Sequence, residues 1–172
     1  NVSPQEYARE YLQYYAKMKD VDASIKLGAV LYTSEWNLSV MQDIKEKIDF
    51  GIMHLYPGHF DKGDLESLNP KEIFYSALAS PAANEEGSLQ EALRILRENA
   101  GRDVPLAVTE YNGSFVQENP VPYRHALGNA LLNAELLRVF MKPENHILMA
   151  NNWNFVNEYW GMVANGFGGE YK

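Results

Sequence analysis

The chain has 172 residues, of which 46% are hydrophobic and 22% are charged, and its net charge is -8 at pH 7. This length suffices for one well-buried domain but falls short of the about 250 residues of a complete eight-stranded α/β barrel. The acidic balance disfavours nucleic acid and anionic membranes as partners, the absence of cysteine excludes disulfides and thiolate catalysis, and no apolar run reaches the about 20 residues that span a membrane.

The hydrophobic pattern predicts helices and strands in alternation. Ser3 and Pro4 suit the start of the first helix, since serine caps a helix well and proline fits its first position. The tyrosines of this helix recur at helical spacing, which favours core and interface packing over a sugar-binding surface. The expected helices cover residues 4–19, 38–48, 71–79, 88–99 and 123–141, and the expected strands cover residues 25–31, 49–55, 106–108 and 147–150.

This alternation predicts an α/β fold with right-handed crossovers and a parallel sheet, in one domain or part of one over residues 1–172. The pattern weakens between Pro57 and Gly87, and a connection of that length is usually a lid or a binding loop. Neither the cysteine count nor the amino-terminal segment identifies a cellular compartment.

Polar and aromatic residues follow the expected strands, at the edge of a parallel sheet where α/β enzymes place their chemistry. Glu110 directly follows the buried run 106–108, and a carboxylate there must be hydrogen-bonded structurally or take part in chemistry. His54 and Tyr56 share one side of the preceding strand, and we expect them near Glu110 if the two strands are neighbours. The other candidates at strand ends are Trp36, Tyr111, Asn112, Trp153 and Asn154, whereas Glu35 is interpreted as a loop or subsite residue.

Glycoside hydrolysis is the chemistry that fits these residues best. A retaining glycosidase uses one carboxylate as nucleophile and a second as acid/base, and Glu110 is the nucleophile candidate. A structural carboxylate held by backbone N–H groups remains the alternative. A metal site from His54, His59 and Asp61 matches no strong spacing pattern, and a phosphate site at residues 166–169 lacks a following helix. We therefore expect no metal and no cofactor.

The sequence also resembles a known family. The runs Thr109-Glu110-Tyr111-Asn112 and His54-Leu55-Tyr56, together with residues 126–157, are similar to the α-L-arabinofuranosidases among the retaining glycoside hydrolases built on (β/α)₈ barrels. The resemblance implies a partial (β/α)₈ (TIM) barrel, about strands five to eight with their helices, which is the carboxyl-terminal half of the catalytic barrel.

The same resemblance assigns roles to single residues. Glu110 corresponds to the nucleophile, Tyr56 to the tyrosine that hydrogen-bonds it, and His54 to a histidine on the substrate side. Asn154 stands where the family more often has a glutamine that touches the sugar. The family's acid/base glutamate lies at the end of strand four, which corresponds to a position before residue 1, so the isolated chain is expected to be inactive.

The expected partner is a neutral oligosaccharide or polysaccharide, with Trp36, Tyr111 and Trp153 as candidates to stack on sugar rings. A β-glucan or xylan hydrolase of the same clan and a non-catalytic carbohydrate-binding half-barrel remain alternatives. The strands at 25–31 and 147–150 would leave two apolar sheet edges open, which predicts self-association or aggregation.

Overall fold

The computed structural model describes residues 2–58, 69–115, 123–156 and 161, and contains a four-stranded parallel sheet. The strands lie in the order β1-β2-β3-β4, which is also their order along the chain. Their bounds are Gly28–Val30 for β1, Phe50–Leu55 for β2, Leu106–Tyr111 for β3 and Ile147–Asn152 for β4. The prediction of an α/β fold with a parallel sheet is confirmed, although β1 is shorter than expected.

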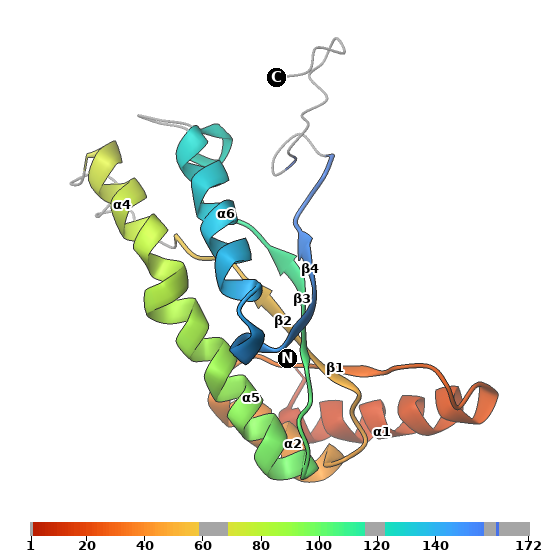
Figure 1. Ribbon diagram of the computed structural model, residues 1–172. Coiled ribbons are helices and arrows are strands. Elements are labelled where there is room, and N and C mark those ends of the chain that lie inside the picture. The colour runs from red at the N-terminus through yellow and green to blue at the C-terminus, as the bar shows by residue number, and fades with distance from the viewer. Residues whose placement is uncertain (1, 59–68, 116–122, 157–160, 162–172) are drawn as a thin grey trace.

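The helices lie where the hydrophobic period predicts them, with different ends. The long helices are α1 (Pro4–Val21), α2 (Ser34–Ile44), α4 (Pro70–Ser80), α5 (Glu86–Ala100) and α6 (Leu127–Phe140). Shorter turns are the π-helical η1 (Pro81–Glu85) and the 3₁₀ turns η2 (Tyr123–His125) and η3 (Pro143–Asn145). Figure 1 shows α4 and α5 as one nearly continuous rod beside the sheet, with α6 next to it. No helix among these described segments is long and apolar enough to span a membrane.

The helical segments at 34–37 and 81–87 were not expected from the sequence. Helix α2 begins at Ser34 rather than at residue 38, because the Thr33 side chain accepts a hydrogen bond from the backbone N–H of Trp36 and so caps the helix. Glu35 is therefore in the first helical turn, and its interpretation as a loop residue is wrong. Residues 81–87 are also helical, since η1 joins α4 directly to α5.

The main core lies between the sheet and the helices that cover it. Buried side chains of β1, β2, β3, α2, α5 and α6 form one cluster, and Ile147 and Ala150 of β4 pack against it partly buried. Gly51 in β2 is required by this packing, because an added Cβ would lie 2.7 Å from Leu31 and 2.9 Å from Leu106. A second, smaller cluster joins α4 and α6 through Ile73, Phe115 and Leu132.

The edge of the sheet at β1 is closed by side chains from α1 and α2. The Leu31 N–H donates to the Ile52 carbonyl of β2. Because successive residues of a strand direct their backbone groups to opposite sides, the N–H and carbonyl of Val30 face the outer edge of the sheet. The Val30 N–H donates to the Tyr7 hydroxyl at 2.7 Å, and the Trp36 indole N–H donates to the Val30 carbonyl at 3.3 Å. The Tyr32 N–H donates to the Asn37 side chain at 2.7 Å. The prediction of an open edge at this strand is therefore wrong.

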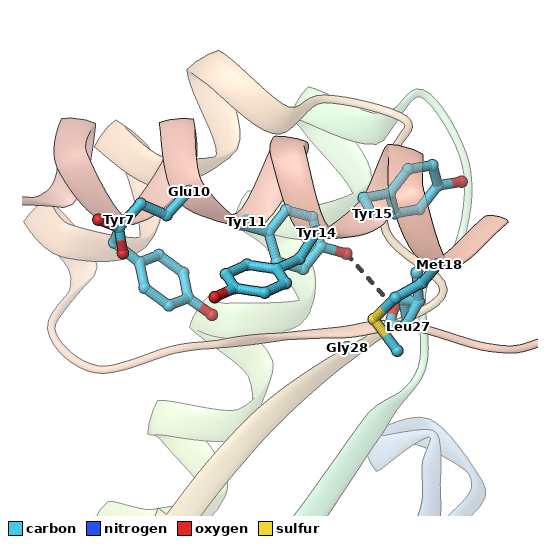
Figure 2. A pocket seen from close by; sticks show the side chains of 8 residues that line it. All are labelled: Tyr7, Glu10, Tyr11, Tyr14, Tyr15, Met18, Leu27 and Gly28. Carbon is cyan, nitrogen blue, oxygen red and sulfur yellow. Dashed lines mark hydrogen bonds between the residues drawn. The ribbon is translucent and has the colours of Figure 1, made fainter. Parts of the chain in front are cut away.

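The tyrosines of α1 pack over β1, as their spacing predicts. Tyr7 and Tyr11 pack against the main core, and the Tyr7 ring lies 5.6 Å from that of Trp36. Tyr14 remains exposed, and it lines a hollow of about 280 Å³ between α1 and residues 27–28 (Figure 2). The aromatic side of α1 thus covers the closed edge of the sheet.

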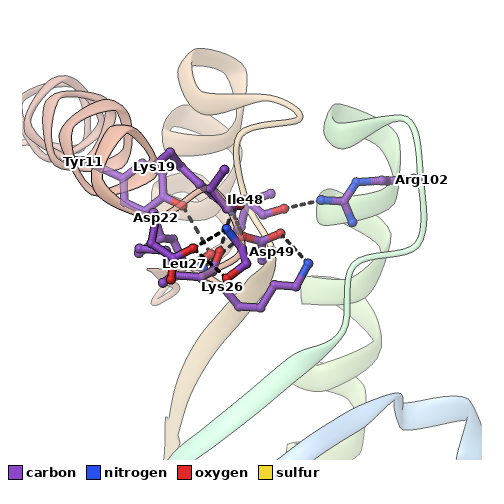
Figure 3. Close-up of polar contacts among 11 residues, drawn as sticks. Tyr11, Lys19, Asp22, Lys26, Leu27, Ile48, Asp49 and Arg102 are labelled. Carbon is purple, nitrogen blue, oxygen red and sulfur yellow. Dashed lines mark hydrogen bonds and ion pairs between the residues drawn. The ribbon is translucent and has the colours of Figure 1, made fainter.

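Asp49 connects α1, β1 and β2 at the amino ends of the strands (Figure 3). One carboxylate oxygen accepts hydrogen bonds from the Leu27 N–H at 3.0 Å and from the Lys19 ammonium at 3.2 Å, and Lys26 lies 3.7 Å from the other oxygen. Burial raises the pKa of Asp49, but the hydrogen bonds from Leu27 and Lys19 outweigh it, so this pKa lies below its usual range.

We predict that Asp49→Asn lowers the free energy of unfolding and weakens its dependence on acid pH. A depressed carboxyl pKa stabilises the fold above the unfolded-state pKa of about 3.9, and this stability is lost as the pH falls through the lower pKa of the folded chain. Urea unfolding followed by circular dichroism between neutral pH and about pH 2 measures the slope. Asp43→Asn, on the exposed side of α2, is the matched control and should keep the wild-type slope.

Candidate active site

Glu110 near the end of β3 is held by two aromatic side chains from β2 and the residue after it. The Tyr56 hydroxyl donates a hydrogen bond to Oε2 of Glu110 at 2.6 Å, and Nδ1 of His54 lies 3.4 Å from the same oxygen. No described residue contacts Oε1 within hydrogen-bonding distance. The three residues proposed together from the sequence are thus brought together at the carboxyl ends of neighbouring strands.

An extra residue in β3 produces this alignment. Met53 pairs with Val108, but His54 pairs with Glu110, so Thr109 is a bulge between them. Bulges beside active sites redirect side chains and are not explained by regular alternation. The Thr109 hydroxyl lies 3.0 Å from Nε2 of His54, which fixes the imidazole from the side opposite Glu110.

Tyr56 is suited to act as a permanent hydrogen-bond donor. Burial raises the pKa of its phenol, and the hydrogen bond to Glu110 and the negative charge of that carboxylate raise it further. The phenol therefore stays protonated throughout the physiological range. A hydrogen bond from a neutral phenol to a carboxylate orients the carboxylate without neutralising it.

A network of four asparagines lies behind this site and joins α6 to the ends of β3 and β4. Oδ1 of Asn112 accepts from the Gly113 N–H at 2.8 Å, from Asn133 at 3.0 Å and from Asn129 at 3.1 Å. Nδ2 of Asn112 donates to the Trp153 carbonyl at 2.6 Å. Asn152 completes the network by donating to Oδ1 of Asn133 at 3.2 Å.

Trp153 and Asn154 follow β4 and are positioned by this network. The Trp153 N–H donates to the Tyr111 carbonyl at 2.9 Å, and the peptide bond between Trp153 and Asn154 is cis. The Trp153 side chain is 42% exposed, as a ring that stacks on a sugar must be. Oδ1 of Asn154 is buried and accepts no hydrogen bond from the described residues.

Two predicted substrate-binding residues, Tyr111 and Asn112, are buried in the structure. Tyr111 alternates with Glu110 and therefore points to the opposite side of β3, where its ring packs edge-on against Phe140 at 5.3 Å. Asn112 is buried, its amide oxygen accepts three hydrogen bonds, and its amide nitrogen donates to the Trp153 carbonyl. Both residues support the site from behind.

Trp36 is placed in the first turn of α2, half-buried against Tyr7. Its observed contacts close the edge at β1, and none of them joins it to Glu110. A role in sugar stacking stays a prediction for Trp36.

The candidate metal and phosphate residues His59, Asp61 and 166–169 lie outside the described residues. The described part of the chain holds no group of three or more acidic or histidine side chains arranged for a metal ion.

A pocket of about 330 Å³ adjoins Tyr56 on the side of α4 and η1. Its polar lining includes Glu85, whose pKa is raised by burial. The remaining residues around it are Pro57, Gly58, Ser76, Ala77, Ser80 and Asn84.

Sequence reasoning missed Thr109, Asn129, Asn133 and Asn152. Period-two alternation gives no signal for a bulge, because the extra residue appears only when two strands are paired. The asparagines carried a weak signal: Asn129 and Asn133 share a helical face with the buried Leu132 and Leu136. Amides on an apolar helical face require buried partners, and residues at strand ends were the available ones.

We predict that Asn133→Ala lowers the free energy of unfolding by about 1–3 kcal/mol, because it removes the hydrogen bonds of Asn133 with Asn112 and Asn152, each of which contributes about 0.5–1.5 kcal/mol. Asn84→Ala is the matched control, since Asn84 is exposed, and its effect should stay within about 0.5 kcal/mol. Urea unfolding of both variants measures the difference. Equal effects in the two variants would show that the network contributes nothing specific.

No protein-family model matches the chain, and no curated protein is found similar to it. Several solved structures are similar to the structure of this chain. The α-L-arabinofuranosidase of Thermotoga maritima, in an arabinose complex, superposes on this chain with a TM-score of 0.75 and 24% sequence identity. The match covers 98% of this chain and 33% of the Thermotoga maritima chain. The family 51 α-L-arabinofuranosidase of Thermotoga petrophila has a TM-score of 0.74 and 24% identity, and the match covers 98% of this chain and 33% of that enzyme. AbfB of Bifidobacterium longum, also of family 51, has a TM-score of 0.73 and 20% identity, and the match covers 99% of this chain and 37% of AbfB.

The chain thus spans about a third of the length of these structures. At this identity the similarity establishes the fold. The parallel four-stranded sheet with its helices matches part of the barrel in these structures. The chain therefore has the fold of part of the (β/α)₈ barrel found in the family 51 α-L-arabinofuranosidases, which it resembles.

Proposed function

We propose that this chain is part of a retaining glycoside hydrolase of the α-L-arabinofuranosidase type, with Glu110 as the nucleophile. The observation that carries the proposal is the contact of Glu110 with Tyr56 at 2.6 Å and with His54 at 3.4 Å, at the carboxyl ends of parallel strands. This is the edge at which barrel enzymes assemble their active sites. The fold similarity to arabinofuranosidases is consistent with this chemistry.

The two carboxylate oxygens of Glu110 have different roles in this proposal. Tyr56 and His54 both contact Oε2, so Oε1 is the oxygen that attacks the anomeric carbon. Attack forms a bond from Oε1 to that carbon, and the glycosidic C–O bond breaks with its electrons on the leaving oxygen. Water then attacks the same carbon, and the Glu110 carboxylate leaves with the electrons of the ester bond.

Tyr56 positions the nucleophile in both steps. Its phenol keeps the carboxylate in one orientation before attack, because the hydrogen bond to Oε2 removes the rotational freedom of the side chain. In the second step the same donor stabilises the negative charge that returns to Glu110. The raised pKa of Tyr56 keeps the proton on the phenol in each state.

The acid/base residue is not among the described groups that contact Glu110. By the resemblance, that glutamate lies at the end of barrel strand four, whereas β1 corresponds to strand five. General acid–base catalysis contributes roughly 10²–10⁴-fold to such a rate. The 172-residue chain by itself is therefore expected to hydrolyse ordinary glycosides very slowly.

The sugar-binding side of the site is assigned to Trp153 and Asn154. Trp153 offers a partly exposed ring, and Asn154 offers a buried amide oxygen without a described partner. A neutral arabinofuranosyl group suits a protein with a net charge of -8 better than an anionic ligand does. A β-glucan or xylan hydrolase is the second candidate, and a panel of aryl glycosides tested on a longer protein that contains this chain separates the two.

We predict that a dinitrophenyl arabinofuranoside labels Glu110 in the isolated chain. Dinitrophenolate leaves without protonation, so the first step needs no general acid, and the glycosyl-enzyme accumulates because no base activates water. Intact mass should increase by one arabinosyl group, and peptide mapping should place it on Glu110. Glu110→Gln should stay unlabelled, and Glu72→Gln, a capping residue of α4, should label like the wild type. Sugar binding without labelling would support a non-catalytic binding half-barrel instead.

We further predict that Tyr56→Phe slows this labelling roughly ten- to hundredfold, since a hydrogen bond to a charged group contributes about 1.5–3 kcal/mol. The rate of dinitrophenolate release measures the effect. Tyr75→Phe is the matched control, because Tyr75 is an exposed tyrosine on α4, and it should label at the wild-type rate. An unchanged rate in Tyr56→Phe would remove Tyr56 from the mechanism.

A further inference from the structure

Thr109 is the extra residue of β3, and its side chain lies beside the imidazole of His54. The Thr109 hydroxyl is 3.0 Å from Nε2 of His54, and Nδ1 of the same ring is 3.4 Å from Oε2 of Glu110. The ring therefore lies between a hydroxyl and a carboxylate. These contacts join the two interior strands, so they do not depend on either edge of the sheet.

The two ring nitrogens of His54 have different neighbours, and this difference selects one tautomer. A neutral imidazole has one N–H donor and one lone pair, whereas an ionised carboxylate only accepts. A lone pair of Nδ1 facing Oε2 of Glu110 would be repelled, so Nδ1 is the nitrogen that carries the proton. The lone pair is then on Nε2, and the Thr109 hydroxyl donates a hydrogen bond to it, because a hydroxyl rotates to suit its partner.

We propose that Thr109 is a positioning residue, which holds His54 in the Nδ1–H tautomer and so directs the imidazole N–H at Oε2 of Glu110. This inference rests on the proposed function of Glu110 as the nucleophile. Tyr56 and His54 then both present donors to Oε2, and Oε1 is left for attack. A carboxylate held in this way reacts faster, because its orientation is set before the sugar binds.

The hydroxyl of Thr109 can be removed without changing the strand. β2 and β3 pair through backbone groups, so the bulge itself does not require a hydroxyl. Valine has the branched shape of threonine, with a methyl group in place of the hydroxyl. Thr109→Val therefore removes the donor to Nε2 and keeps the strand, and Thr109→Ser keeps the donor on a smaller side chain.

Nitrogen-15 NMR of the chain with labelled histidines reads the tautomer directly, without any substrate. The chain has four histidines, and the resonances that His54→Gln removes belong to His54. On the alkaline plateau of a pH titration, Nδ1 of His54 should have the chemical shift of a protonated nitrogen and Nε2 that of an unprotonated one. Thr109→Val should move the two shifts toward each other, and Thr109→Ser should keep the native pattern. A native Nε2–H tautomer, or an unchanged pattern in Thr109→Val, would overturn the proposal.

The rate of labelling by the dinitrophenyl arabinofuranoside measures the effect on Glu110. Thr109→Val should lower the maximal labelling rate about two- to tenfold, the effect of losing one neutral hydrogen bond, while the half-saturating concentration stays unchanged. Thr109→Ser should label at nearly the native rate. Ser88→Ala is the matched control, because it removes a hydroxyl of α5 that donates to the Asn84 carbonyl at 3.2 Å, and it should label like the wild type.

A double-mutant cycle separates action through His54 from a general effect on the strand. In a His54→Gln background, Thr109→Val should cause no further loss of labelling rate, because the group that Thr109 positions is already gone. Equal losses in both backgrounds would show that Thr109 does not act through His54. A native chain that fails to label would refute the proposed function of Glu110 instead, and the NMR spectra would still decide the tautomer of His54.

Discussion

The pairing of β2 with β3, including the extra residue Thr109, is the constraint on which the proposed site depends. Both strands are interior, so their backbone groups are used on both sides and their register is fixed. Without the bulge, His54 would lie opposite Thr109, and the carboxylate of Glu110 would be directed elsewhere. The hydrogen bond from Tyr56 then selects one orientation of a side chain that the register has already brought within reach.

The sequence was sufficient to predict the parallel sheet and the meeting of Glu110, Tyr56 and His54. A buried apolar run that ends in a carboxylate has few possible positions in an α/β fold, and neighbouring strands place their ends together. The bulge at Thr109 was not predictable, because it is a property of two paired strands rather than of one. The burial of Tyr111 and Asn112 follows from the same local geometry.

Helix boundaries and strand edges failed for a different physical reason. Capping by Thr33 adds a turn to α2, and this turn carries Trp36 and Asn37 to the edge of β1. A hydrophobic pattern reports which side chains avoid water, but it does not report where a backbone N–H finds its acceptor. The closure of β1 by Tyr7 therefore appears only when α1 and β1 are seen together, although each element was predicted separately.

The two halves of the proposed site depend on different strands. The contact of Glu110 with Tyr56 lies at the ends of the two interior strands of the sheet. Trp153 follows the edge strand directly, and its backbone is tied to Tyr111 and Asn112. The proposed sugar-binding side therefore depends on the last strand, whereas the proposed nucleophile does not. Because the reactivity of Glu110 and the affinity for the sugar depend on different strands, a loss of one and a loss of the other have separate structural causes.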